Sequence, residues 1–228
     1  MVVGNVPDAV DFVVVGGGPG GYVAALRASR AGRKVLLVDA RGQGGLGGVC
    51  LREGCIPSKT LIETADLRHR MGTAGALGLE DVRPTFNMST FQQFKTQVVE
   101  RLTSGVSALL AKAGVETVDG TFALTDEKTA VISLSDGNVR FVSFQDLILA
   151  TGSSPLALAH IPFDGETVLD STHVLSLSEL PASLVVIGAG YVGVEIGIAL
   201  AKLGSKITIV EQADRVLPGM DEALSRPL

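Results

Sequence analysis

The chain has 228 residues, 46% of them hydrophobic and 19% charged, a balance typical of a globular protein with one large or two modest domains. Its formal net charge is −5 and no basic stripe is present, which argues against nucleic acid and anionic membrane surfaces as partners. The N-terminus lacks the positive region of a signal peptide, and glycines interrupt the first apolar run. We therefore expect a cytoplasmic protein without a membrane span.

The first predicted elements are a strand, a turn, a helix and a second strand. Residues 11–15 form an apolar run typical of a buried strand, and residues 16–21 form a glycine turn. Residues 22–31 predict a helix, and residues 34–39 predict the next strand. This order is typical of the opening of a Rossmann-type parallel sheet.

The glycine turn has the G-x-G-x-x-G spacing at Gly16, Gly18 and Gly21. The first glycine permits a tight turn, the second lets the backbone approach a pyrophosphate, and the third lets helix and strand pack closely. The helix N-terminus then stabilises the anion. Asp39 ends the second strand and is the expected acceptor of ribose hydroxyls, so the sequence predicts a dinucleotide site.

Two helices are predicted next. Residues 49–69 favour a helix that Pro57 distorts or restarts. Residues 91–113 carry apolar side chains at helical spacing, which predicts a single buried face. The residues expected on that face are Phe94, Val98, Leu102, Val106 and Leu109.

Short strands are predicted at residues 115–118, 129–134 and 138–144, separated by Thr-Asp-Glu-Lys and Ser-Asp-Gly-Asn turns. They indicate a small antiparallel insertion in the first domain. Residues 146–150 resemble another buried parallel strand. A Ser- and Pro-containing stretch follows, and we place the domain boundary near Pro155.

The second domain, residues 156–228, repeats the order of the first, residues 1–155. Its strand, turn, helix and strand are predicted at residues 183–187, 188–193, 194–203 and 206–210. The first glycine and the closing acid are 23 positions apart in both copies. Two copies of one device imply two related ligands. The fold class is therefore α/β, with two Rossmann-like nucleotide-binding units, the second truncated.

The second turn contains Gly188, Gly190 and Gly193, and Glu211 ends its second strand. A carboxylate at this position pairs with a free 2′-hydroxyl and repels a 2′-phosphate. The second site is therefore predicted to bind NAD rather than NADP.

The two cysteines, Cys50 and Cys55, lie in a C-x4-C spacing near a predicted helix start. Such a pair can close a strained disulfide, and a helix N-terminus stabilises the attacking thiolate. Lys59 adds a nearby positive charge. The three histidines are scattered without ligand spacing, so redox chemistry is favoured and no metal site is expected.

The run from Gly47 to Lys59, GGVCLREGCIPSK, resembles GGTCLNxGCIPSK of the class I pyridine nucleotide-disulfide oxidoreductases. Its Leu and its Ile-Pro-Ser-Lys look most like those of dihydrolipoyl dehydrogenases. Further matching motifs are the glycine turn at 16–22, Ala-Thr-Gly-Ser at 150–153, residues 188–195, and Val-Glu at 210–211 leading to Leu-Pro-Gly-Met-Asp at 217–221. One departure is Arg52-Glu53, which replaces an Asn-containing pair between the cysteines.

This resemblance implies that FAD lies on the first turn and that electrons pass from the cysteines through FAD to NAD. It implies that Cys50 exchanges with the substrate and that Cys55 lies beside the flavin. Glu195 matches the acidic partner of Lys59, in an ion pair next to the flavin. The residues implied to bind FAD are Gly16, Gly18, Gly20, Gly21, Asp39, Lys59, Gly120, Thr151, Gly152 and Ser153.

The implied substrate is dihydrolipoamide, carried on a lipoyl domain of a 2-oxoacid dehydrogenase complex, and the implied assembly is a homodimer. The family pattern continues well beyond residue 228, with a dimerisation domain and a His-Glu acid-base pair. We therefore expect a fragment whose activity alone is doubtful.

Three alternatives remain open. The chain could be a related glutathione- or mercuric-type reductase, because these enzymes share the cysteine spacing and both turns. It could be a non-catalytic remnant that binds FAD or NAD. A thioredoxin-reductase-like enzyme ranks last, because its cysteine pair belongs in the NAD unit rather than after the first strand pair.

Overall fold

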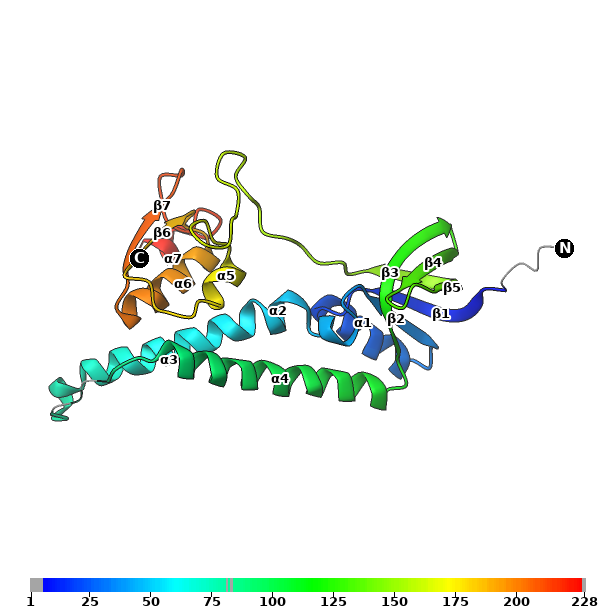
Figure 1. Ribbon diagram of the computed structural model, residues 1–228, viewed down its shortest axis with the longest axis horizontal. Coiled ribbons are helices and arrows are strands. Elements are labelled where there is room, and N and C mark those ends of the chain that lie inside the picture. Colours follow the sequence, from blue (N-terminus) through cyan, green and yellow to red (C-terminus); the bar gives the residue numbers. More distant parts are fainter. Residues whose placement is uncertain (1–5, 81, 83, 227–228) are drawn as a thin grey trace. The chain divides into compact units, whose positions relative to one another are not determined.

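The computed structural model describes residues 6–80, 82 and 84–226 (Figure 1). The chain divides into two compact units, each discontinuous in sequence. The first contains residues up to Arg52 together with Val99–Ser154, and the second contains Glu53–Val98 together with the chain from Pro155 onward. The predicted α/β class is confirmed.

The first unit is built on five strands that close into a ring. Its strands are β1 (Asp8–Val15), β2 (Val35–Asp39), β3 (Glu116–Asp126), β4 (Thr129–Leu134) and β5 (Val139–Leu149). β1 pairs in parallel with β2 and β5, and β2 pairs in parallel with β3. β4 is antiparallel to both β3 and β5 and closes the ring. The antiparallel insertion is thus built from extensions of the parallel strands.

The prediction of separate strands at 138–144 and 146–150 is wrong, because β5 is continuous. Its first part pairs with β4 and its later part with β1. Gln145 and Asp146 lie where the two predicted strands were divided, and Arg33 donates to both, at 3.3 Å to Gln145 Oε1 and 2.6 Å to Asp146 Oδ2. β3 likewise extends to Asp126 instead of ending at residue 118.

The core of this unit lies between the parallel and antiparallel parts of the ring. Its buried members are Val10, Val13, Leu36, Val38, Ala130, Ile132, Val142 and Phe144. α1 (Pro19–Arg30) connects β1 to β2, and the short helices η1 (Gly42–Gly45) and α2 (Gly48–Arg52) follow β2. The ring and α1 therefore fix the ends of β1 and β2, where the predicted first site lies.

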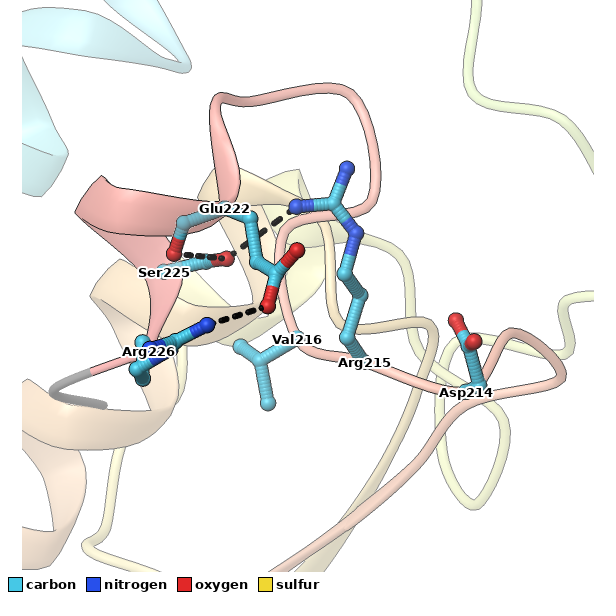
Figure 2. A pocket seen from close by; sticks show the side chains of 6 residues that line it. All are labelled: Asp214, Arg215, Val216, Glu222, Ser225 and Arg226. Atoms are coloured by element: carbon cyan, nitrogen blue, oxygen red, sulfur yellow. Dashed lines mark hydrogen bonds and ion pairs between the residues drawn. The ribbon is translucent and has the colours of Figure 1, made fainter.

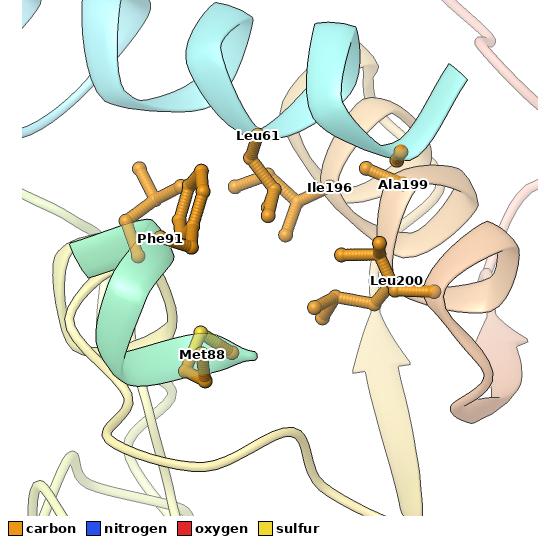
Figure 3. Packing of buried hydrophobic residues seen from close by; sticks show 9 residues of the cluster. Leu61, Met88, Phe91, Ile196, Ala199 and Leu200 are labelled. Atoms are coloured by element: carbon orange, nitrogen blue, oxygen red, sulfur yellow. The ribbon is translucent and has the colours of Figure 1, made fainter. Parts of the chain in front are cut away.

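The second unit combines helices with a two-stranded parallel sheet. Its elements are α3 (Cys55–Gly72), η2 (Ala74–Leu77), α5 (Ser171–Leu175), β6 (Ser183–Ile187), α6 (Tyr191–Leu203), β7 (Lys206–Val210) and α7 (Glu222–Ser225). β6 and β7 match the predicted strands and pair in parallel. Apolar side chains from α3, α5, α6 and the start of α4 form its core (Figure 3). The buried set includes Leu61, Met88, Phe91, Ile196, Ala199 and Leu200.

The predicted buried face of the long helix α4 (Met88–Lys112) is wrong at three of its five positions. Phe94, Leu102 and Leu109 are exposed, whereas Val106 is buried as predicted. Met88, Phe91 and Leu110 are also buried, and with Val106 they form a stripe that is rotated from the predicted one but overlaps it. Buried Phe91 and exposed Phe94 are three positions apart and adjacent on the helix surface, so helical spacing alone does not fix the centre of the buried stripe.

The helix predicted over residues 49–69 is divided. α2 ends at Arg52 and α3 begins at Cys55, so Pro57 occupies the first turn of α3. Proline is tolerated there, because first-turn N–H groups have no acceptor within the helix. The predicted restart is confirmed.

No helix in the described part of the chain is both long enough and apolar enough to cross a bilayer.

Candidate dinucleotide and thiol sites

The first glycine turn joins β1 to α1 and is held by backbone and carboxylate contacts. Gly16 has a φ of +103°, which a side chain rarely adopts, and its N–H donates to Val38 O at 2.7 Å. Gly17 N–H donates to Asp39 Oδ2 at 2.6 Å, and Arg41 N–H donates to Asp39 Oδ1 at 2.8 Å. Asp39 thus fixes the turn as well as lying at the predicted ribose position.

The second turn repeats these bonds. Gly188 has a φ of +98°, and its N–H donates to Val210 O at 2.7 Å. Glu211 accepts from Ala189 N–H at 2.6 Å and from Ala213 N–H at 2.9 Å. These two N–H groups, Ala213 first, hold the pKa of Glu211 below its ordinary value. The predicted repeat therefore extends to individual hydrogen bonds.

The helices that leave the two turns begin without side-chain caps. Gly18 is the N-cap of α1 and Gly190 is the N-cap of α6, and neither position supplies a capping side chain. The first N–H groups of a helix have no acceptor within the helix and favour anions. Both turns therefore suit a pyrophosphate.

The third glycine of each turn allows helix and strand to approach. A Cβ at Gly21 would lie 1.7 Å from Gly16 O, and one at Gly193 would lie 2.7 Å from Gly188 O. Contacts shorter than 3.0 Å force a shift of the backbone. The packing role predicted for the third glycine is observed in both units.

The other predicted FAD residues of the first unit fall into two groups. Gly20 lies in α1, 3.7 Å from Ala150 Cβ when its own Cβ is added, and Thr151–Ser153 directly follow Ala150. Thr151 N would be 3.3 Å from a Cβ at Gly16, so Gly20 and Thr151 lie beside the turn. Gly120 lies in β3, where an added Cβ would be 2.7 Å from Ser133 O. The close approach of β4 is sufficient to explain that glycine.

A pocket of about 260 Å³ lies at the carboxyl ends of β2 and β3. Its lining residues are Leu37, Asp39, Arg41, Gly42, Gln43, Gly44, Leu46, Thr117, Val118 and Asp119. Ligands of parallel sheets bind at such carboxyl ends. Sequence reasoning did not single out Asp119 or Gln43. The pairing of β3 beside β2, with Asp119 opposite Asp39, is the signal that identifies Asp119.

The segment that carries the first cysteine rests on the first glycine turn. Gly47 N–H donates to Gly17 O at 2.8 Å. A Cβ at Gly48 would lie 2.6 Å from Gly18 Cα, so the two backbones are in direct contact. Gly48 is also the first residue of α2, which carries Cys50. The predicted nucleotide turn and the first thiol segment are therefore one local structure.

Cys55 is exposed and is the first residue of α3, as expected for a thiol at a helix start. Lys59 lies four residues later on the same helix, and its Nζ is 2.6 Å from Glu195 Oε2 on α6. The ion pair expected between Lys59 and Glu195 is present. Their side chains are 57% and 40% exposed, so a ligand could reach both.

A second pocket, of about 560 Å³, follows Glu211 in the second unit (Figure 2). Its lining residues are Asp214, Arg215, Val216, Glu222, Ser225 and Arg226. Arg226 pairs with Glu222 at 2.8 Å, and Arg215 donates to Pro218 O at 2.8 Å. Its two arginines are thus already engaged by neighbouring groups.

Across the described residues, no group of three or more His, Cys, Asp or Glu side chains could hold a metal ion.

A family profile described as pyridine nucleotide-disulphide oxidoreductase matches residues 10–228. The chain belongs to this family. It is 41% identical over 227 residues to dihydrolipoyl dehydrogenase 2 of Haloarcula marismortui, covering 99% of this chain and 47% of that protein. It is 42% identical over 221 residues to the dihydrolipoyl dehydrogenase of Pseudomonas aeruginosa, covering 95% and 47%. The predicted resemblance is confirmed.

Solved structures of related proteins agree with this assignment. LpdA from Mycobacterium tuberculosis superposes with a TM-score of 0.85 at 29% identity, covering 96% of this chain and 48% of that one. The HOCl-induced flavoprotein disulfide reductase RclA from Escherichia coli, in a Cu(II) complex, has a TM-score of 0.78 at 27% identity, covering 95% and 45%. The chain thus spans about half the length of the relatives it matches.

Proposed function

We propose that the chain belongs to a flavin-dependent disulfide oxidoreductase of the dihydrolipoyl dehydrogenase type, using FAD, NAD and a Cys50–Cys55 disulfide. The observation that carries this proposal is the anchoring of the first thiol segment on the first glycine turn. Gly47 is hydrogen-bonded to Gly17, and Gly48 is in contact with Gly18, two residues before Cys50. A dinucleotide on this turn would therefore lie close to a redox thiol.

The residues of the first unit fit FAD. The uncapped start of α1 can hold the pyrophosphate, and the lack of side chains at the turn leaves room for it. Asp39 keeps unused lone pairs beyond its two backbone bonds, so it can also accept from ribose hydroxyls. FAD, when bound, would accept the electron pair of the dithiol and transfer it to NAD.

The two cysteines would carry out thiol–disulfide exchange. A thiolate of dihydrolipoamide attacks Cys50 Sγ and forms a mixed disulfide, and Cys55 leaves as a thiolate. The second substrate thiol then attacks the mixed disulfide, which releases lipoamide and leaves both cysteines reduced. The ammonium of Lys59, four residues beyond Cys55 and held by Glu195, would supply positive charge to this region.

The second turn fits NAD. The uncapped start of α6 can hold a pyrophosphate, and Glu211 is the acceptor for a ribose 2′-hydroxyl. Its backbone hydrogen bonds favour the ionised form, which would repel the 2′-phosphate of NADP. A lipoyl carrier domain as partner, a homodimeric assembly and a cytoplasmic location stay predictions.

The test is a visible absorption spectrum of the purified, gel-filtered 228-residue chain, before and after anaerobic reduction with dihydrolipoamide. We expect a flavin spectrum, with a long-wavelength charge-transfer band from the Cys55 thiolate after reduction. Cys50→Ser should show this band without reductant, because it leaves Cys55 as a thiol. Cys55→Ser should bind flavin without the band. A colourless wild-type chain after FAD reconstitution would contradict the proposal.

The similarity to RclA favours a second candidate, a flavoprotein reductase of another disulfide. The mercuric-type reductase expected as an alternative from the sequence can be tested beside it. Oxidised lipoamide, oxidised glutathione and mercuric ion can be compared as acceptors of electrons from NADH. A preference for lipoamide supports the first candidate, a preference for oxidised glutathione supports the second, and a preference for mercuric ion supports the mercuric-type reductase.

A further inference from the structure

Two carboxylates share the pocket at the carboxyl ends of β2 and β3. Asp39 and Asp119 are register partners on these neighbouring parallel strands, so their side chains leave the same face of the sheet. Both line the pocket of about 260 Å³, together with Leu37 and Thr117 from the same register. A group bound beside Asp39 would therefore also meet Asp119.

The two carboxylates differ in their existing hydrogen bonds. Each oxygen of Asp39 accepts a backbone N–H, Oδ2 from Gly17 and Oδ1 from Arg41. The carboxylate of Asp119 is exposed, and the described residues provide it with no hydrogen-bond donor. Asp119 thus has the greater capacity for a new donor, because an ionised carboxylate offers about four lone-pair sites.

The glycine turn of η1 leaves space for both carboxylates. A Cβ at Gly42 would lie 2.5 Å from Asp119 Cγ, and one at Gly45 would lie 1.9 Å from Asp39 Oδ1. Gln43, between these glycines, donates to Thr117 Oγ1 at 2.7 Å and accepts from Ser107 Oγ at 2.8 Å. The turn is therefore tied to β3 and α4, with its backbone against the two acids.

We propose that Asp119 is a further binding residue, which accepts a hydrogen bond from the adenosine part of the dinucleotide beside Asp39. An ionised carboxylate accepts hydrogen bonds and cannot donate them. The donor is therefore a ribose hydroxyl or the exocyclic amine of adenine. This inference rests on the proposed function, since it assumes an adenine dinucleotide at the first turn.

The test compares Asp119→Asn with Asp126→Asn in the full 228-residue chain. Asp126 ends the same strand, is exposed, and is absent from the pocket lining, so its substitution matches the charge change. The affinities of FAD and ADP are measured by FAD fluorescence and by calorimetry. We expect Asp119→Asn to weaken both by roughly 10- to 100-fold, as for a hydrogen bond to a charged acceptor, and Asp126→Asn to change neither.

Analogues of ADP identify the donor. If Asp119 accepts from the 2′-hydroxyl, Asp119→Asn weakens ADP and inosine diphosphate but not 2′-deoxy-ADP. If it accepts from the amine, the same change weakens ADP and 2′-deoxy-ADP but not inosine diphosphate. Equal affinity of wild type and Asp119→Asn for FAD and ADP overturns this inference and leaves the proposed function intact. A wild-type chain that binds neither FAD nor ADP overturns both.

Discussion

The two glycine turns share their hydrogen bonds but differ in their surroundings. Gly17 and Ala189 each donate to the closing acid at 2.6 Å. Around the first turn, a Cβ at Gly16 would lie 2.1 Å from Ala150 O at the end of β5. Around the second, no atom of the described residues lies within 4 Å of a Cβ added at Gly188 or Gly190.

This difference shows which part of a nucleotide-binding device is local. In each unit the turn, helix, second strand and acid span 24 residues directly after the first strand, and they form the same bonds without help from the rest of the chain. The close packing of the first turn depends on distant segments, namely β5 and the loop before α2. The chemistry of a turn is local, whereas its enclosure depends on the whole unit.

The largest expected effect comes from the third glycine of each turn. Gly21→Ala should lower the free energy of unfolding of the first unit by about 3 kcal/mol or more, because its Cβ would overlap Gly16 O. Gly193→Ala should cost about 1 kcal/mol in the second unit, where the corresponding distance is 2.7 Å and fewer groups surround the turn.

Urea unfolding can follow each unit separately. The chain has two tyrosines and no tryptophan, and Tyr22 lies in α1 while Tyr191 begins α6. Tyr191→Phe leaves a fluorescence signal from the first unit, and Tyr22→Phe leaves one from the second. Gly105→Ala in α4 is the control, because its Cβ meets no atom within 4 Å in the part of the chain that the structure describes, and alanine favours helix. If Gly21→Ala and Gly193→Ala lowered the free energy of unfolding equally, the two turns would not differ in how tightly they are packed.

A smaller effect is expected from the closing acid of the second turn as the pH changes. The pKa of Glu211 is lower in the folded chain than its ordinary value of 4.5, mainly through the N–H groups of Ala213 and Ala189. Its stabilising contribution is therefore complete above the unfolded pKa and is lost as the pH falls through the folded pKa.

Glu211→Gln should lower the urea midpoint of the second unit at about pH 7. At about pH 3 the difference between the midpoints of the variant and the wild type should be smaller. The Tyr191 signal reports this change, and the Tyr22 signal should not respond. A difference that is constant with pH would show that the carboxylate charge does not stabilise the second turn.

The smallest expected effect on stability is that of the Lys59–Glu195 ion pair. Both side chains are substantially exposed, at 57% and 40%, so solvent screens their attraction. A double-mutant cycle of Lys59→Met and Glu195→Gln should give a coupling free energy below about 1 kcal/mol, which decreases with added salt.

The Arg70–Glu63 pair on α3, at 3.7 Å and more exposed, provides a reference cycle with an even smaller coupling. A coupling above about 2 kcal/mol for Lys59 and Glu195 would mean that the pair supports the second unit itself. We expect its main contribution instead in the flavin and charge-transfer spectra.

The sequence was sufficient for the features that depend on local order. Both βαβ openings, the restart of a helix near Pro57 and the Lys59–Glu195 pair are present in the structure. Motif spacing finds such features, because strand, turn and helix preferences act over a few residues. Binding of FAD or NAD by the named residues stays a prediction.

Features that depend on distant partners could not be obtained in this way. β5 is one strand because it pairs with β4 over its first part and with β1 over its later part, and β1 is more than 100 positions away. The centre of the buried face of α4 was misassigned, because Phe91 and Phe94 are neighbours on the helix surface and only tertiary packing distinguishes them. Asp119 belongs to no motif and becomes recognisable only when β3 is paired with β2.

The contact between Gly45 and Asp39 also limits how this chain can evolve. A Cβ at Gly45 would occupy the place of Asp39 Oδ1, so no larger residue fits at position 45 while the aspartate keeps its position. If Asp39 is first replaced by a residue with a smaller side chain, the space beside Gly45 opens and position 45 can accept larger residues. The two positions are therefore linked by epistasis, in which the order of substitutions decides which lineages remain viable.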